Sequence, residues 1–228
     1  MAKKKFYRPL LFALLRILHA FFNLFPFRAG YAFGGFAGAF CYRVLPRERK
    51  RTLSHLATAF PEMPRPELEK LACEVFRNFG YGLIELALLP KLNARLDRIL
   101  RMEGREHFDR ALARGKGIVA VAAHFGNWEL MGGWIAKSGY PISALARRVY
   151  YEKYDKFLTD TRSKMGLRTI YRDEPARNVV RALKQNRIVA VVPDQDVDSV
   201  EGVFVDFFGK PAYTPTAPVR FAQATGAA

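Results

Sequence analysis

The chain shows two kinds of hydrophobic pattern. Between residues 105 and 192, short unbroken apolar runs are separated by longer segments in which apolar residues recur every three or four positions. Short runs bounded by turn residues are typical of strands buried on both faces, and the longer spacing is typical of amphipathic helices. Their alternation predicts the α/β class, with a mixed, mainly parallel sheet flanked by helices.

The individual elements follow from the same pattern. We expect strands over residues 118–123, 141–145, 169–171 and 188–192. We expect helices over residues 105–114, 127–138, 151–165 and 175–185. Asn186 is well placed to end the last of these helices in a left-handed conformation.

A separate helix is expected over residues 64–90. Pro66 suits a first helical turn, and apolar residues recur along one face of this segment. We expect this face to serve packing rather than function. It consists of Leu68, Leu71, Ala72, Val75, Phe76 and Phe79.

The N-terminal segment is almost continuously apolar. Residues 6–27 have the length to cross a bilayer, but Arg16 and His19 near the middle would be costly there. The length and the aromatic residues argue against a cleaved signal peptide. With the second apolar stretch at 29–45, we expect residues 1–45 to form membrane-associated helices, in the interface or as a hairpin. A core helix of a soluble protein is the alternative.

Composition narrows the classes of partner. The 228 residues are half apolar, which suffices for a packed core, and the net charge of +16 favours an anionic partner. Nucleic acid is not expected, because Lys and Arg are scattered and no nucleic-acid-binding motif is present. Cys41 and Cys73 stand in no metal-binding spacing, so we expect no metal site and a reducing compartment.

A titratable ring follows the first predicted strand, in VAVAAHFGNWEL (119–130). Functional sites of α/β proteins gather beyond the carboxyl ends of the strands, where both His124 and Asp194 fall. Gly126 lets the backbone bend, and Asn127 can cap the next helix. Glu129 would then lie on the first helical turn, within reach of His124.

A histidine beside a carboxylate can act as a general base. The neutral ring takes a proton from a hydroxyl that attacks a carbonyl, while the carboxylate fixes the tautomer and stabilises the imidazolium. No protein nucleophile is needed when the substrate supplies the hydroxyl, and the sequence has no GxSxG motif. From the residues alone, a histidine that only caps the strand end remains the alternative.

Five blocks together resemble the bacterial lipid A late acyltransferases, the lauroyl/myristoyl transferase family. They are AFPE (59–62), HFGNWE (124–129), TRSKMG (161–166), VVPDQD (191–196) and GVFVDFFGKPAYTPTAP (202–218). The resemblance covers essentially the whole chain. It implies a glycerolipid-acyltransferase-like fold and a membrane-bound O-acyltransferase that needs no cofactor.

The resemblance also implies substrates and a location. The donor would be an acyl-carrier-protein thioester, and the acceptor would be a hydroxyl of a lipid A precursor or related glycolipid. The enzyme would lie on the cytoplasmic face of the cell inner membrane, against an anionic membrane surface. The alternatives are a different acceptor, such as a phosphatidylinositol mannoside, and a catalytically idle glycolipid-binding relative.

Individual roles follow from the matching positions. The resemblance implies His124 as general base with Glu129 as its partner, and Arg162 as a ligand for an anionic group or the oxyanion. Asp194 would line the site or support it. Gly126 and Asn127 belong to the same turn, whose backbone N–H groups are candidate substrate contacts.

Two further groups of residues each have two possible roles. Arg147 and Arg148, after the second strand, could contact a phosphate or the carrier, or they could form a solvated basic surface. Phe204, Phe207 and Phe208 could line an acyl channel or belong to the core.

We therefore expect two parts, an N-terminal membrane-associated segment, 1–45, and an acyltransferase domain, 46–228. Family members continue for several dozen residues beyond RFAQATGAA, so we expect the C-terminal part of this domain to be missing.

Overall fold

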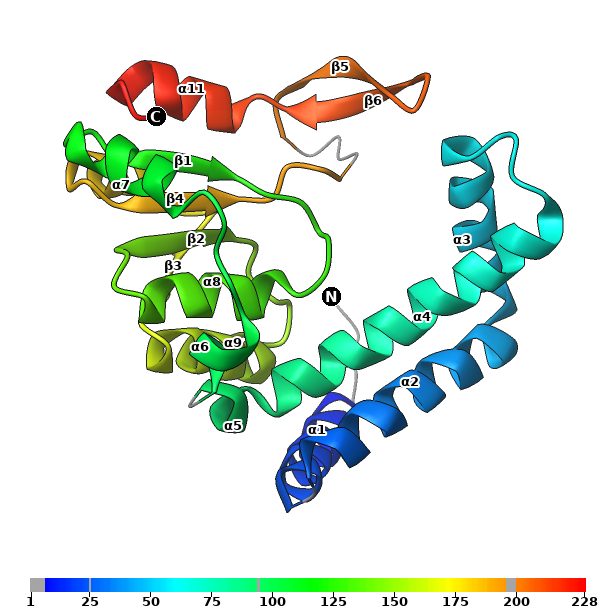
Figure 1. Cartoon of the computed structure of the whole chain (residues 1–228). Coiled ribbons are helices and arrows are strands. Elements are labelled where there is room, and N and C mark those ends of the chain that lie inside the picture. Colours follow the sequence, from blue (N-terminus) through cyan, green and yellow to red (C-terminus); the bar gives the residue numbers. More distant parts are fainter. Residues whose placement is uncertain (1–6, 25, 94, 196–199) are drawn as a thin grey trace. The chain divides into compact units, whose positions relative to one another are not determined.

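The computed structural model describes residues 7–24, 26–93, 95–195 and 200–228. It contains two compact units (Figure 1). Residues 13–92 form a helical unit. The α/β unit consists of the described residues of 93–228 together with Tyr7–Phe12. Residue 45, the expected domain boundary, lies within the helical unit.

The α/β unit contains a four-stranded sheet with the order β1-β4-β2-β3, in which every neighbouring pair is parallel. The strands are β1 (Ile118–Val121), β2 (Ile142–Ala146), β3 (Arg168–Tyr171) and β4 (Ile188–Val191). The helices between and before them are α7 (Arg105–Ala113), α8 (Trp128–Lys137), α9 (Glu152–Lys164) and α10 (Arg177–Lys184). The predicted α/β class and these predicted elements are confirmed, with ends shifted by a few residues.

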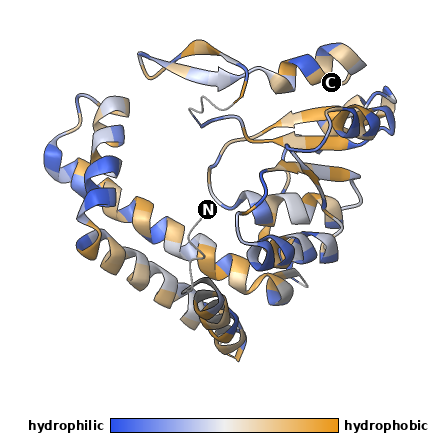
Figure 2. Cartoon of the chain, turned by 180° about the vertical axis from the view of Figure 1, so that it is seen from behind, coloured by the Kyte–Doolittle hydropathy of each residue, from blue (hydrophilic) through white to orange (hydrophobic). Residues whose placement is uncertain are grey.

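Two apolar clusters hold the helices against the two faces of the sheet. Since successive strand residues point to opposite faces, Ile118 and Ile188 pack with Ile135 of α8, while Val189 packs with Leu183 of α10. Figure 2 shows the strands of this sheet as predominantly hydrophobic. Burial on both faces explains why these strands appear in the sequence as unbroken apolar runs.

Asn186 ends α10 as predicted, with a left-handed φ of 58°. Its side chain also connects two other segments, because Oδ1 accepts the N–H of Gly117 at 2.9 Å and Nδ2 donates to the carbonyl of Leu112 at 3.0 Å. These bonds fix the turn that leads into β1.

Antiparallel pairing occurs only outside this sheet in the described part of the chain. β5 (Gly202–Phe207) and β6 (Lys210–Pro215) form a hairpin, and α11 (Ala217–Thr225) follows it. The expected mixed sheet is thus a parallel sheet and a separate hairpin. Phe204, Phe207 and Phe208 are more than half exposed on this hairpin, so the core reading of these residues is wrong.

The helical unit contains α2 (Phe27–Val44), α3 (Pro46–Ala59), α4 (Arg65–Ala87) and most of α1 (Tyr7–Leu24). The short helices α5 (Leu89–Asn93) and α6 (Leu96–Ile99) follow. None of the described helices combines the length and the hydropathy that crossing a membrane requires.

α4 confirms the helix expected over 64–90, with proline in its first turn. Its apolar face is only partly used for packing. Leu68 and Ala72 are buried, whereas Val75 and Phe79 are exposed, Phe79 to 70%. The expectation that the whole face packs is therefore wrong for these two residues.

α2 and α4 pack closely because glycines face each other. A Cβ atom added to Gly80 would lie 2.1 Å from the carbonyl oxygen of Gly34, and one added to Gly38 would lie 2.3 Å from that of Phe76. Main-chain atoms cannot move aside without separating the helices, so this approach requires glycine.

Gly80→Ala should therefore destabilise the helical unit by about 1–3 kcal/mol through overpacking. Gly82→Ala is the matched control on the same helix, because a Cβ there would meet no atom within 4 Å. Alanine's higher helix propensity should make this variant more stable by about 0.5–1 kcal/mol. Urea-induced unfolding followed by circular dichroism measures both, and equal effects would contradict the packing of α2 on α4.

Candidate active site

His124 and Asp194 meet beyond the carboxyl ends of β1 and β4. These strands are neighbours, and their register pairs Val121 with Val191. The two residues follow these paired positions at equivalent distances along the chain, which brings them together although 70 residues separate them in the sequence. Both side chains therefore lie beyond the carboxyl ends of the strands, as predicted.

Asp194 binds His124 through both of its carboxylate oxygens. Oδ1 lies 2.7 Å from the ring Nδ1, and Oδ2 accepts the backbone N–H of His124 at 2.7 Å. An ionised carboxylate only accepts hydrogen bonds, so Nδ1 carries the proton and the lone pair of the neutral ring lies on Nε2. The pair therefore presents a basic nitrogen on the side of the ring opposite Asp194.

The contacts with His124 lower the pKa of Asp194. Burial alone would raise the pKa of Asp194, but the hydrogen bonds from the ring and backbone N–H of His124 outweigh it and hold the pKa below its ordinary value. A lowered pKa adds stability above the unfolded-state pKa, and this stability is lost as the pH falls through the folded-state value. Asp194 is thus ionised at neutral pH.

The turn after β1 fixes the direction of the ring. Gly126 has a left-handed φ of 60°, and Asn127 caps α8 by accepting the N–H of Leu130 at 3.0 Å. The ring of Trp128 packs against that of His124 in a T-shaped arrangement, with 4.8 Å between the centroids and 74° between the planes. The strand–turn–helix arrangement and the Asn127 cap are confirmed. The His124 side chain is 27% exposed and hence open to a substrate.

Glu129 lies on the first turn of α8, as expected, but its partner in the structure is Arg162 of α9. Nε of Arg162 donates to Oε2 of Glu129 at 2.8 Å, and Nη2 donates to Oε1. Both side chains are about 15% exposed. The expected hydrogen bond between Glu129 and His124 is thus replaced by two pairs, His124–Asp194 and Glu129–Arg162, because β4 brings Asp194 to the ring from the neighbouring strand.

The hydrogen bond to Glu129 raises the pKa of Arg162 further, so this guanidinium is always charged. Glu129 neutralises it through Nε and Nη2. The N–H groups on Nη1 point away from this carboxylate and suit an anionic group.

Arg162→Met should destabilise the α/β unit by about 3 kcal/mol, because it leaves the nearly buried carboxylate of Glu129 unpaired. Lys156→Met is the control on the same helix, since its pair with Asp160 is exposed to 74% and 51%. Breaking an exposed pair costs at most about 1 kcal/mol. The free energy of unfolding in urea measures both variants, and a similar small loss for both would contradict the structural role of the Glu129–Arg162 pair.

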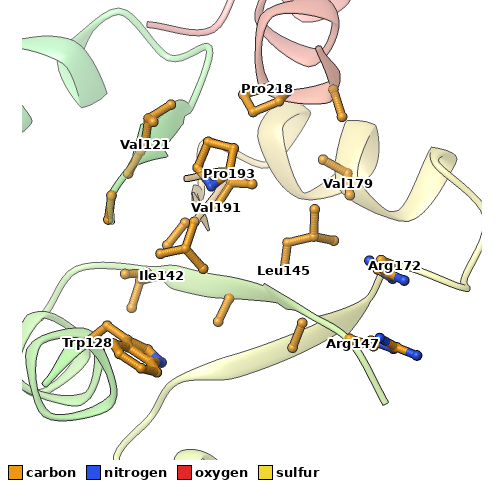
Figure 3. Close-up of a pocket in the computed structure, with 18 of the residues that line it drawn as sticks. Val121, Trp128, Ile142, Leu145, Arg147, Arg172, Val179, Val191, Pro193 and Pro218 are labelled. Carbon is orange, nitrogen blue, oxygen red and sulfur yellow. The ribbon is translucent and has the colours of Figure 1, made fainter. Parts of the chain in front are cut away.

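A pocket of about 650 Å³ lies at this end of the sheet (Figure 3). His124, Glu129, Arg147 and Arg162 line it among the predicted site residues. Asp194 supports His124 without lining the pocket, and the same holds for the turn residues Gly126 and Asn127. The three phenylalanines of the hairpin do not line it either.

The pocket wall is mainly apolar, and one part of it consists of small residues. Ala120 of β1, Ala190 of β4 and Ala144 of β2 are register partners in adjacent strands, and all three line the pocket. They point to the same face of the sheet, and about 5 Å separates adjacent strands. Small side chains at these positions leave an apolar trough across the sheet. Sequence reasoning missed it because alanine is equally common in cores.

The two candidate arginines after β2 have different surroundings. Arg148 binds Asp173 at 2.9 Å and stacks on the ring of Tyr171, 3.8 Å from its centroid. Arg147 lines the pocket, together with Arg172 after β3, which sequence reasoning did not single out. Of the predicted pair, Arg147 is therefore the residue that lines the pocket.

Known proteins resemble the chain along most of its length. The sequence model of one protein family, described as bacterial lipid A biosynthesis acyltransferase, matches residues 3–228. A phosphatidylinositol mannoside acyltransferase of Mycobacterium tuberculosis is 32% identical over 76% of this chain and 57% of its own length. Lipid A biosynthesis palmitoleoyltransferase of Escherichia coli K12 is 29% identical (75% and 56%), and the lauroyltransferase of the same strain is 27% identical (89% and 66%).

The chain thus spans a little over half the length of the first of these relatives. The five sequence blocks and the match over nearly every residue agree with each other. The chain belongs to the bacterial lipid A biosynthesis acyltransferase family.

Proposed function

We propose that this chain forms the catalytic part of a membrane-bound O-acyltransferase. It moves a fatty acyl group from an acyl-carrier-protein thioester to a hydroxyl of a glycolipid, such as a lipid A precursor or a phosphatidylinositol mannoside. The observation that carries the proposal is the His124–Asp194 pair at an apolar pocket of about 650 Å³. The names of the relatives support acyl transfer to a glycolipid.

The reaction needs one general base. Nε2 of His124 takes the proton of the acceptor hydroxyl as its oxygen attacks the thioester carbonyl carbon. The tetrahedral oxyanion collapses, the C–S bond breaks, and the thiolate receives the proton from the imidazolium. Asp194 stays ionised and stabilises the imidazolium between these two transfers. The products are an ester and a free thiol, so no covalent enzyme intermediate is required.

Arg162 is the proposed partner of the developing negative charge. It is charged, nearly buried and held by Glu129, and it lines the same pocket as His124. A fixed cation in a site of low polarity stabilises an oxyanion without having to reorganise during the reaction. In this proposal Glu129 positions Arg162, while Asp194 positions the base.

The alanine trough is the proposed site of the acyl chain. Ala144→Leu would fill part of it, so we expect a preference for acyl chains shorter by about two to three carbon atoms. Transfer rates measured over a series of carrier-bound saturated chains test this. An unchanged optimum in a normally folded variant would place the chain elsewhere.

The helical unit is the proposed contact with an anionic membrane surface, which in the proposal is the cytoplasmic face of the inner membrane. α2 has two faces: Gly30, Gly34 and Gly38 are buried, whereas Phe33, Phe36 and Phe40 are exposed. Apolar segments also run along α1 and α4, and α3 is strongly hydrophilic (Figure 2). α3 begins with basic residues. An exposed apolar face beside basic residues suits an interfacial position against anionic lipid.

Transfer of a radiolabelled acyl group tests the proposed function. Membranes that contain the protein are given carrier-bound or coenzyme A-bound acyl donors, and the product lipid is identified by mass spectrometry. We expect a glycolipid whose mass has increased by one acyl group, with the carrier-bound donor preferred. Binding of glycolipid without any such product would instead indicate a catalytically idle relative.

A further inference from the structure

Two arginines at the ends of β2 and β3 take no part in the mechanism above. Arg147 follows β2 directly and Arg172 follows β3 directly. The register pairs Ala146 with Tyr171, and the N–H of Arg172 donates to the carbonyl of Ala146 at 2.9 Å. The two arginines thus extend the register of the parallel strands, and Figure 3 shows them together at one end of the pocket.

Neighbouring carboxylates do not neutralise these two guanidinium groups. The nearby acids of the described chain have other partners: Arg148 binds Asp173 at 2.9 Å and Glu174, which also lines the pocket, at 3.8 Å, and Asp155 accepts hydrogen bonds from Val149 N–H and the Tyr171 hydroxyl. Within the described part of the chain, Arg147 and Arg172 make no side-chain hydrogen bond or ion pair. Like charges on adjacent strands repel each other, and an anion between them removes that cost.

The two arginines lie at the same edge of the sheet as the proposed base, His124. In the sheet order β1-β4-β2-β3, His124 and Asp194 lie three residues beyond the ends of β1 and β4, and Arg147 and Arg172 directly follow β2 and β3. Adjacent strands lie about 5 Å apart, so the ends of β1 and β4 lie on average about 10 Å across the sheet from the ends of β2 and β3. One substrate can therefore reach both, with its reacting atom at His124 and an anionic group at the arginines.

We infer that Arg147 and Arg172 bind a phosphate group of a substrate. The inference rests on the proposed function, because it assigns this site to the substrates of that reaction. Each guanidinium offers five N–H donors in a planar fork that matches phosphate oxygens, and two forks satisfy most of the acceptors of one phosphate. Two sources have this chemistry: the phosphodiester of a phosphatidylinositol-type acceptor, and the phosphate on the pantetheine arm of a carrier protein.

Binding of soluble fragments tests the inference without requiring turnover. The probes are glycerophosphoinositol for the acceptor and pantetheine 4′-phosphate for the donor, each compared with its phosphate-free form, inositol or pantetheine. The proteins are the natural chain, the variant Arg147→Gln/Arg172→Gln, and the control Arg114→Gln/Arg181→Gln. The control loses the same charge at exposed positions that do not line the pocket. Affinity is measured by NMR from the resonances of the probe itself, which report binding in the same way for all three proteins.

We expect one phosphorylated probe to bind the natural chain and the control equally, and the Arg147/Arg172 variant at least about tenfold more weakly. The probe that shows this loss identifies the source of the phosphate. Equal affinity in all three proteins, equal binding of the phosphate-free probe, or binding of neither phosphorylated probe would overturn the inference. If the fragment binds as expected but no glycolipid is acylated, the proposed function fails and the phosphate site stands.

Discussion

His124→Ala should reduce acyl transfer to glycolipid by about 10³- to 10⁴-fold, because it removes the general base. The loss should appear in kcat with little change in KM, since the ring contacts the hydroxyl proton rather than the bulk of either substrate. The rate of product formation under saturating donor and acceptor measures the effect. Added imidazole should restore part of the activity, which a structural role of His124 would not explain.

His107→Ala is the control for this variant. His107 lies on α7 with an exposed side chain, and it contacts Arg110 and Glu106 rather than the pocket. We expect full activity. Retention of more than a tenth of the natural rate by His124→Ala, with the fold intact, would show that another group removes the proton.

Asp194→Asn should lower the rate by about 10³-fold or more, although it changes one atom. The amide can donate a hydrogen bond to Nδ1, and this favours the tautomer whose proton lies on Nε2, where the base must be free. The variant also cannot stabilise the imidazolium. Asp160→Asn on α9 is the control, because its carboxylate pairs with Lys156 at the surface.

Comparison with Glu129→Gln separates two readings of the site. If Glu129 were the partner of the base, its variant would show the tautomer defect and Asp194→Asn would not. In the structure Glu129 binds Arg162, so its variant should weaken the positioning of that cation instead. We therefore expect the defect in the ring only when Asp194 is changed.

The sheet could be predicted from sequence because its strands are short apolar runs between turn residues. The turn around His124 could be predicted for a similar local reason, since Gly126 and Asn127 each fit one backbone position. α3 and the β5–β6 hairpin were not predicted. α3 has few apolar positions, with only Leu53 buried, and the hairpin exposes apolar side chains instead of alternating buried and exposed ones.

The carboxylate that binds His124 could not be predicted from any local sequence pattern. Glu129 is five residues away and Asp194 is 70 residues away, so spacing favoured the nearer carboxylate. The order of the strands decides the matter, because β4 rather than a helix lies beside β1. The same holds for Arg172, which becomes a neighbour of Arg147 only through the pairing of β3 with β2.

The position of the proton on the His124 ring shows whether Asp194 leaves Nε2 free to act as the base. Nitrogen-15 NMR of the ring at neutral pH distinguishes a proton on Nδ1 from one on Nε2. We expect a protonated, hydrogen-bonded Nδ1 and an unprotonated Nε2 in the natural chain and in Asp160→Asn. In Asp194→Asn we expect this tautomer to be lost. A proton on Nε2 in the natural chain, or the same tautomer in Asp194→Asn as in the natural chain, would contradict the proposed roles of His124 and Asp194.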